Sequence, residues 1–88
     1  MLYLGYLDGR ELDADEGGPW REVFPLRGGL VLIDSEQSRS RVYHALKDAL
    51  PRDTPLLVAQ LDEVPKFKGM APGALAWARD RAPRRRPD

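Results

Sequence analysis

The most hydrophobic part of the chain lies between residues 30 and 61, where the spacing of apolar positions changes twice. Residues 30–33 are an unbroken run of β-forming side chains, the next segment has apolar residues at intervals of three and four, and the apolar run returns at residues 56–61. A continuous run between turn residues is typical of a buried strand, and helical spacing is typical of a helix with one buried face. The pattern predicts a strand, a helix over residues 36–50 and a second central strand, joined as one right-handed βαβ unit.

The helix over residues 36–50 is expected to pack by one side only. Asp34 or Ser35 can accept hydrogen bonds from its first turn, and Asp34 with Gln37 has the spacing of a capping box. The apolar side is predicted to hold Val42, Tyr43, Ala45, Leu46, Ala49 and Leu50. The solvated side is predicted to hold Ser40, Arg41, His44, Lys47 and Asp48.

Two more strands are predicted before this unit. Residues 2–7 are apolar on both faces and favour an internal strand, which ends at an Asp-Gly turn; the acidic residues 10–19 favour a loop with at most one helical turn. Residues 20–26 alternate as a strand, and Pro25 places that strand at an edge or at a bulge because it has no amide hydrogen to donate. The Gly28-Gly29 pair that follows predicts a hairpin.

After the second central strand, residues 66–70 form a basic, partly apolar loop and Pro72 begins a short helix that ends before Pro83. The predicted fold class is α+β, a four-stranded mostly antiparallel sheet with one main packed helix and a short C-terminal helix. Residues 1–81 are predicted to form one small domain, and residues 82–88 a disordered basic tail.

Composition removes several classes of protein. The 88 residues include no cysteine and one histidine, so neither a disulfide nor a typical zinc centre is expected. No apolar run approaches the roughly 18 residues of a membrane span, and no basic leader precedes residues 2–7, which predicts a cytoplasmic protein. The net charge is zero, but residues 1–34 hold seven acids and three bases, and the remainder holds seven acids and eleven bases. This asymmetry can steer a charged partner or favour self-association.

Two groups of residues resemble catalytic or metal sites. Ser40, His44 and Asp48 lie four residues apart on the predicted helix, but an exposed helix face has no oxyanion hole, so a solvated surface is favoured. The acids of the first loop could bind a hard cation, although a solvated acidic loop is again favoured. Asp8, at the end of the first strand, is retained as a metal candidate. The acids concerned are Asp8, Glu11, Asp13, Asp15 and Glu16.

The candidate contact surface lies in the C-terminal third. Cations there alternate with large apolar side chains, a composition typical of a surface that binds phosphates and bases or a protein partner. Phe67 and Trp77 are interpreted as core or lid residues rather than as stacking platforms. The candidate contact residues are Lys66, Phe67, Lys68, Met70, Arg84, Arg85 and Arg86.

The order of strand, acidic turn, hairpin, helix and strand resembles the small CRISPR-associated, SinR-like group of ferredoxin-fold proteins. The resemblance rests on residues 2–8, on Gly18-Pro19-Trp20, on residues 29–35, on Tyr43-His44-Ala45-Leu46-Lys47 and on residues 56–58. It implies a ferredoxin-like βαββαβ sheet, here truncated, a homodimer and a role with nucleic acid, with Asp8 at the family's candidate metal position. The chain departs from that family because residues 10–19 are too short and glycine-rich for a full first helix.

These observations predict a small non-catalytic interaction module that forms a homodimer and binds a protein partner. The alternative is a nucleic-acid-binding protein of a ferredoxin-like family, related to metal-dependent nucleases. Self-association is expected because strand 20–26 is an edge and so small a domain cannot cover all of its aromatic side chains. The only histidine lies on a polar helix face and no glycine-rich loop runs from a strand into a helix, so neither a cofactor nor an enzyme acting alone is expected.

Overall fold

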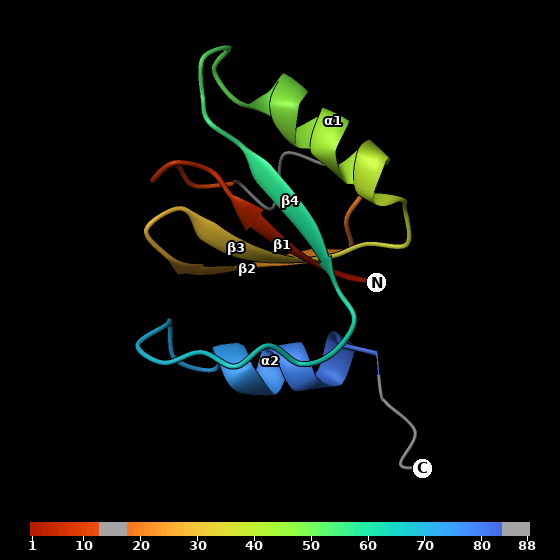
Figure 1. The fold of residues 1–88 in the computed structure, drawn as a ribbon, viewed down its shortest axis with the longest axis vertical. Helices are drawn as coiled ribbons and strands as arrows, with labels where there is room; N and C mark the ends of the chain where they lie inside the picture. Colours follow the sequence, from red (N-terminus) through yellow and green to blue (C-terminus); the bar gives the residue numbers. More distant parts are fainter. Residues whose placement is uncertain (13–17, 84–88) are drawn as a thin grey trace.

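The computed structural model of the chain describes residues 1–12 and 18–83. A single four-stranded sheet, in the order β2-β3-β1-β4 and antiparallel at every pair, lies between two helices (Figure 1). The predicted α+β class is confirmed, and the sheet is consistent with a truncated ferredoxin-like arrangement. The elements are β1 Leu2–Tyr6, β2 Glu22–Arg27, β3 Leu30–Asp34, α1 Arg39–Ala49, β4 Leu57–Leu61 and α2 Ala74–Arg81.

The place of β4 corrects the predicted βαβ unit. β3 and β4 run in the same direction because each is antiparallel to β1, which lies between them. The crossover through α1 therefore spans an inserted strand, as in a split βαβ motif. The prediction that β4 is a central strand is wrong, because β4 forms one edge of the sheet. The prediction that β1 is internal is confirmed.

Each face of the sheet carries its own hydrophobic cluster, and each cluster has its own helix. Side chains alternate across a strand, so Tyr3 and Ile33 point to the α1 side while Leu2 and Leu32 point to the α2 side. All four side chains are fully buried. Figure 1 shows α1 and α2 on opposite sides of the sheet. The strands β1 and β3 can carry apolar side chains on both faces because a helix covers each face of the sheet.

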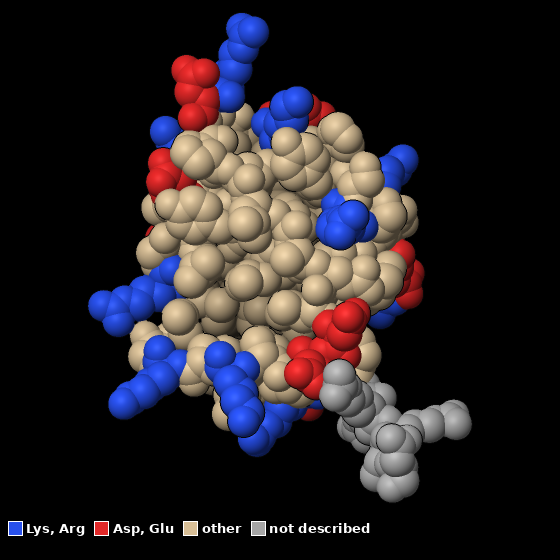
Figure 2. All heavy atoms as spheres, viewed as in Figure 1, with Lys and Arg blue, Asp and Glu red and all other residues tan. Residues whose placement is uncertain are grey.

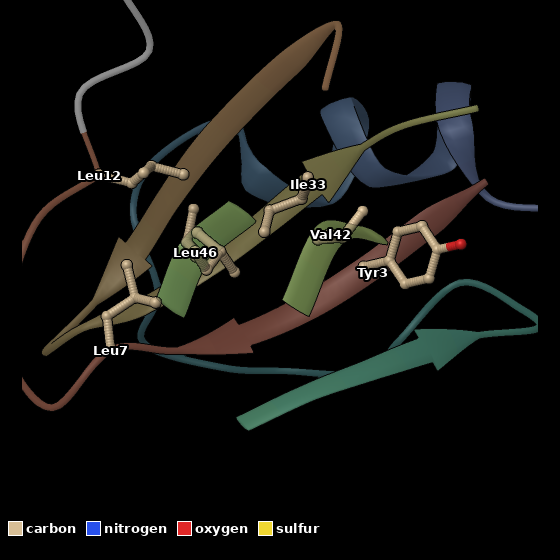
Figure 3. Packing of buried hydrophobic residues seen from close by; sticks show 7 residues of the cluster. Tyr3, Leu7, Leu12, Ile33, Val42 and Leu46 are labelled. Atoms are coloured by element: carbon tan, nitrogen blue, oxygen red, sulfur yellow. The ribbon is translucent and has the colours of Figure 1, made fainter. Parts of the chain in front are cut away.

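The α1-side cluster fixes α1 on the sheet (Figure 3). Val42 and Leu46 are the fully buried side chains of α1, and they lie over β1 and β3 together with Leu12 from the first loop. A Cβ atom built on Gly5 would stand 3.0 Å from a Val31 methyl group and 3.9 Å from a Leu46 methyl group. The glycine in β1 therefore leaves the space that these larger side chains fill.

The beginning of α1 differs from the sequence prediction. The helix begins at Arg39 rather than at residue 36, and its N-cap is Ser38, whose hydroxyl accepts a hydrogen bond from the Arg41 amide at 3.2 Å. Asp34 is still in β3. Ser35 is fully buried; its hydroxyl donates to the Pro19 carbonyl and accepts from the Gln37 amide. The predicted capping box is wrong because Asp34 ends β3 and the helix is capped four residues later, at Ser38.

The β2–β3 hairpin is confirmed, and Pro25 accounts for its irregularity. The register runs from Glu22 opposite Asp34 to Pro25 opposite Val31, and it shifts between Pro25 and Arg27. The missing amide hydrogen of proline and the bulge occur together at the edge of the sheet. Sequence reasoning expected an edge or a bulge, and β2 has both.

On the other face, α2 is fastened to β2 by one cluster of aromatic and charged groups. The Phe24 and Trp77 rings lie 5.5 Å apart, and the Arg81 guanidinium lies 4.1 Å from the Trp77 ring centre. Glu22 accepts hydrogen bonds from the Trp77 indole at 3.2 Å and from Arg81 at 2.6 Å. Ala82 is also buried on this face, so the packed part of the chain reaches at least this residue.

Candidate functional site

The helix residues that resembled a catalytic triad lie in solvent. Ser40, His44 and Asp48 are all exposed on α1. His44 and Asp48, with Arg41, line an open hollow that also touches Pro19, whereas Ser40 does not line it. The predicted solvated face is confirmed. The structure brings no nucleophile, base and orienting group of this set together on a substrate site.

Asp8 is hydrogen-bonded to the side chain of Tyr6. It is exposed, it adopts a positive φ of 52°, and its carboxylate accepts a hydrogen bond of 2.8 Å from the Tyr6 hydroxyl. That hydrogen bond raises the pKa of the Tyr6 phenol, because ionised Tyr6 would lose it. Within residues 1–12 and 18–83, no group of three or more His, Cys, Asp or Glu side chains is placed to hold a metal. Asp13, Asp15 and Glu16 lie outside the described residues.

The predicted contact loop divides into exposed cations and packed apolar side chains. Lys66 and Lys68 are exposed, whereas Phe67 and Met70 are half-buried against the α2-side cluster. This agrees with the interpretation of Phe67 as a lid residue. The Arg27 guanidinium donates to the Gly69 carbonyl at 3.3 Å, so the loop gains a third cation that sequence reasoning missed. Arg84, Arg85 and Arg86 lie outside the described residues.

The aromatic side chains expected to drive self-association are half-buried within the fold. Trp20 packs against the α1-side cluster, and Phe24, Phe67 and Trp77 pack against the α2-side cluster. The edge strand β2, to which that expectation was tied, is charged at both ends, Glu22 and Arg27, and carries a proline and a bulge. Charges, prolines and bulges are the features that prevent an edge strand from pairing with another chain. β2 therefore lacks the properties of a strand that pairs with another chain.

The opposite edge has none of these features. β4 has the sequence Leu-Val-Ala-Gln-Leu, with no charge, no proline and a regular register along β1. Within the described part of the chain, the backbone hydrogen bonds formed outside strands and helices do not involve β4. The outward amides and carbonyls of an edge strand are a template for another strand. We call β4 with Met1, Tyr43 and Leu57 the β4 surface.

Three of the four large hydrophobic side chains that the described residues expose belong to the β4 surface. Leu57 is 52% exposed, Met1 45% and Tyr43 37%. Met1 lies beside β4, because the Gln60 amide nitrogen is 3.5 Å from the Met1 sulfur. The fourth side chain, Leu75, is on α2 and is 40% exposed.

Tyr43 is placed by the helical repeat. Successive residues of an α-helix lie about 100° apart around its axis, so Tyr43 is on the side opposite to Arg41 and Asp48. Those two residues line the hollow at Pro19, in the segment that leads into β2, and β2 and β4 are the opposite edges of the sheet. Tyr43, on the other side of the helix, is therefore on the β4 side. The face that carries β4 is uncharged over most of its centre, and charged side chains stand mainly around its rim (Figure 2). The β4 surface is thus a strand edge with an apolar side chain on each side of it.

No protein-family model, curated protein or solved structure matches this chain. The resemblance to the CRISPR-associated, SinR-like proteins therefore stays an expectation from the sequence. In the described part of the chain, no helix has the length and hydrophobicity needed to cross a membrane.

Proposed function

We propose that this protein is a non-catalytic interaction module that binds an extended polypeptide segment along the edge of β4. The observation that supports this is the contrast between the two edges of one sheet. β2 carries Glu22, Pro25 and Arg27 together with a bulge, whereas β4 carries none of these features. Strand addition to an open edge is a common way of recognising a polypeptide, because main-chain hydrogen bonds provide affinity and alternate side chains provide specificity.

The chemistry of the β4 surface favours a polypeptide over a nucleic acid. Its strand has no cation to meet a phosphate, and its exposed side chains are aliphatic, thioether, phenol and amide groups. Most of the affinity of nucleic-acid binding comes from cations that neutralise phosphates. An apolar strand edge instead gains from burying apolar area and from main-chain hydrogen bonds.

A capture experiment with one matched control tests this proposal. The tagged chain is used to capture proteins from its native cell lysate in the presence of nuclease. We expect Leu57→Lys to lower the amount of captured protein at least tenfold, because the new charge would have to be buried in the contact. Leu75→Lys puts the same charge on a leucine of similar exposure on α2, and it should leave capture unchanged. Equal capture by the wild type and both variants would reject β4 as the binding edge.

A second candidate, nucleic-acid binding, is favoured by the convergence of three cations. The contact between Arg27 and Gly69 brings this arginine to the loop that exposes Lys66 and Lys68. Phosphate contacts at this position would make the affinity for a single-stranded oligonucleotide fall steeply between about 50 and 200 mM salt. Fluorescence titration of a labelled oligonucleotide with the wild type and with Lys66→Gln/Lys68→Gln should then show weaker binding by the variant. The affinity of the variant should also depend less steeply on salt concentration. Arg39→Gln/Arg41→Gln, which removes two exposed cations from α1, is the control.

A further inference from the structure

We infer that the segment that binds at β4 is the β4 strand of a second copy of this chain, so that two sheets join into one eight-stranded antiparallel sheet. This inference rests on the proposed function and names the partner of the same edge. It requires the two β4 strands to run antiparallel across a two-fold axis, the usual symmetry of a homodimer. The axis would pass beside Ala59, the middle residue of β4.

The sequence of β4 is complementary to itself in this arrangement. Pairing about Ala59 sets Leu57 of one copy opposite Leu61 of the other, sets Val58 opposite Gln60, and brings the small Ala59 side chains together. A two-fold axis forces a strand to meet its own sequence reversed, so a charge near the middle would oppose a like charge. β4 has no charge at any of its five positions, and symmetric pairing therefore carries no such repulsion.

The pairing would also continue the hydrophobic clusters of each copy. Leu61 belongs to the α2-side cluster, and Leu57 lies on the same face of the strand because the two are four residues apart. The half-exposed Leu57 of one copy would then extend the α2-side cluster of the other. On the other face, Val58 packs against the α1-side cluster and would lie opposite Gln60, which contacts Met1.

The side chains that flank β4 make a second copy a better fit than a bare peptide. A pair of five-residue strands alone covers little area, and a stable interface needs roughly 1,000 Å² or more. Met1 and Tyr43 are exposed on this side of the molecule. In a two-fold dimer both copies would bury these side chains, which adds to the area covered by the strands. The largely uncharged centre of this face, with most of the charged side chains around it, matches the usual arrangement of an apolar interface core within a polar rim (Figure 2).

Sedimentation velocity of the purified full chain tests the inference. We expect the wild type and Leu75→Lys to sediment as dimers at about 10 to 100 μM, where a micromolar dissociation constant populates the dimer. Leu57→Lys should raise the dissociation constant at least tenfold, so that the fraction of dimer at about 10 μM falls well below that of the wild type. Its thermal unfolding should still resemble that of a folded domain, because Leu57 is already half-exposed. A monomeric wild type at 100 μM, or a Leu57→Lys variant that remains a dimer, would overturn the inference.

A cysteine cross-link tests the pairing itself, since the chain has no cysteine of its own. Residues directly opposite in an antiparallel pair have Cβ atoms about 4.5 to 5.5 Å apart, within reach of a disulfide after a small shift. We expect Ala59→Cys to form a covalent dimer on oxidation with copper phenanthroline, and exposed Ala76→Cys on α2 to stay mostly monomeric. A dimer in solution without the Ala59→Cys cross-link would reject the two-fold pairing about Ala59.

Failure of this inference can be told apart from failure of the proposed function. If the purified wild type is a monomer while lysate capture of a different protein depends on Leu57 and not on Leu75, the second copy is rejected and the interaction module stands. If the wild type neither dimerises nor captures a protein through Leu57, both are rejected.

Discussion

Replacing Leu46 with Ala is expected to lower the free energy of unfolding by about 2 to 4 kcal/mol. Leu46 is fully buried in the α1-side cluster, and one of its methyl groups packs over Gly5 of β1. Gly5 has no side chain that could move into the vacated space, so the substitution would leave a cavity between α1 and the sheet. Urea unfolding followed by circular dichroism measures the change.

Leu75→Ala is the matched control for this substitution. Leu75 is also a helical leucine, but it is 40% exposed on α2, so its truncation removes much less buried area. We expect it to cost less than about 1 kcal/mol. A loss below about 0.5 kcal/mol for Leu46→Ala would mean that α1 does not pack on the sheet as described.

Replacing Gly29 with Ala is expected to destabilise the fold by about 2 to 4 kcal/mol, through the backbone rather than the core. Gly29 ends the hairpin turn with a φ of 87°, which costs an L-residue about 1 to 2 kcal/mol. A Cβ atom there would also lie 2.2 Å from the backbone nitrogen of Gly9. The Gly29 carbonyl accepts a hydrogen bond from the Leu7 amide at 2.8 Å, so moving this turn away from the β1 loop disturbs a second contact.

Gly28→Ala separates the two causes. Gly28 has a positive φ of 57°, but a Cβ atom on it would meet nothing within 4 Å. Its substitution should therefore cost only the conformational term, about 1 to 2 kcal/mol. Equal losses for the two alanine variants in urea unfolding would show that the close approach of Gly29 to Gly9 carries no energy of its own.

The two edges of the sheet link these packing arguments to the proposed function. β2 is held from the α2 side by the contacts of Glu22 and Phe24 with Trp77, and its bulge disturbs the edge that it presents. β4 lies under α1 on one face, but its outer edge is regular and uncharged. Another strand can therefore pair with the sheet at β4 but not at β2. If copies of the chain pair through β4, each copy has only one edge to offer, so the assembly closes as a dimer and does not grow into an open chain.

The sequence by itself determined the local elements of this protein. Residues 2–7 and 30–33 are apolar at consecutive positions, and such strands are stable only when both faces are covered. Pro25 excluded β2 from the sheet interior because it cannot donate a ladder hydrogen bond, and Gly28-Gly29 provided the hairpin turn. The apolar spacing identified the buried face of α1 through Val42 and Leu46, whereas Tyr43 and Ala49, which were predicted on the same face, are exposed. Each of these features depends on the properties of neighbouring residues, which the sequence displays directly.

Only the tertiary structure decided which strands are neighbours and which surface stays open. Nothing local in residues 56–61 distinguishes a central strand from an edge strand, because that depends on β1 lying between β3 and β4. The same pairing brings Met1 beside Gln60, nearly sixty residues away, and leaves Leu57 and Tyr43 exposed on one side. The hydrophobic pattern of a segment shows how much apolar surface that segment must bury. Which other segment covers this surface depends on contacts between residues that are distant in the chain.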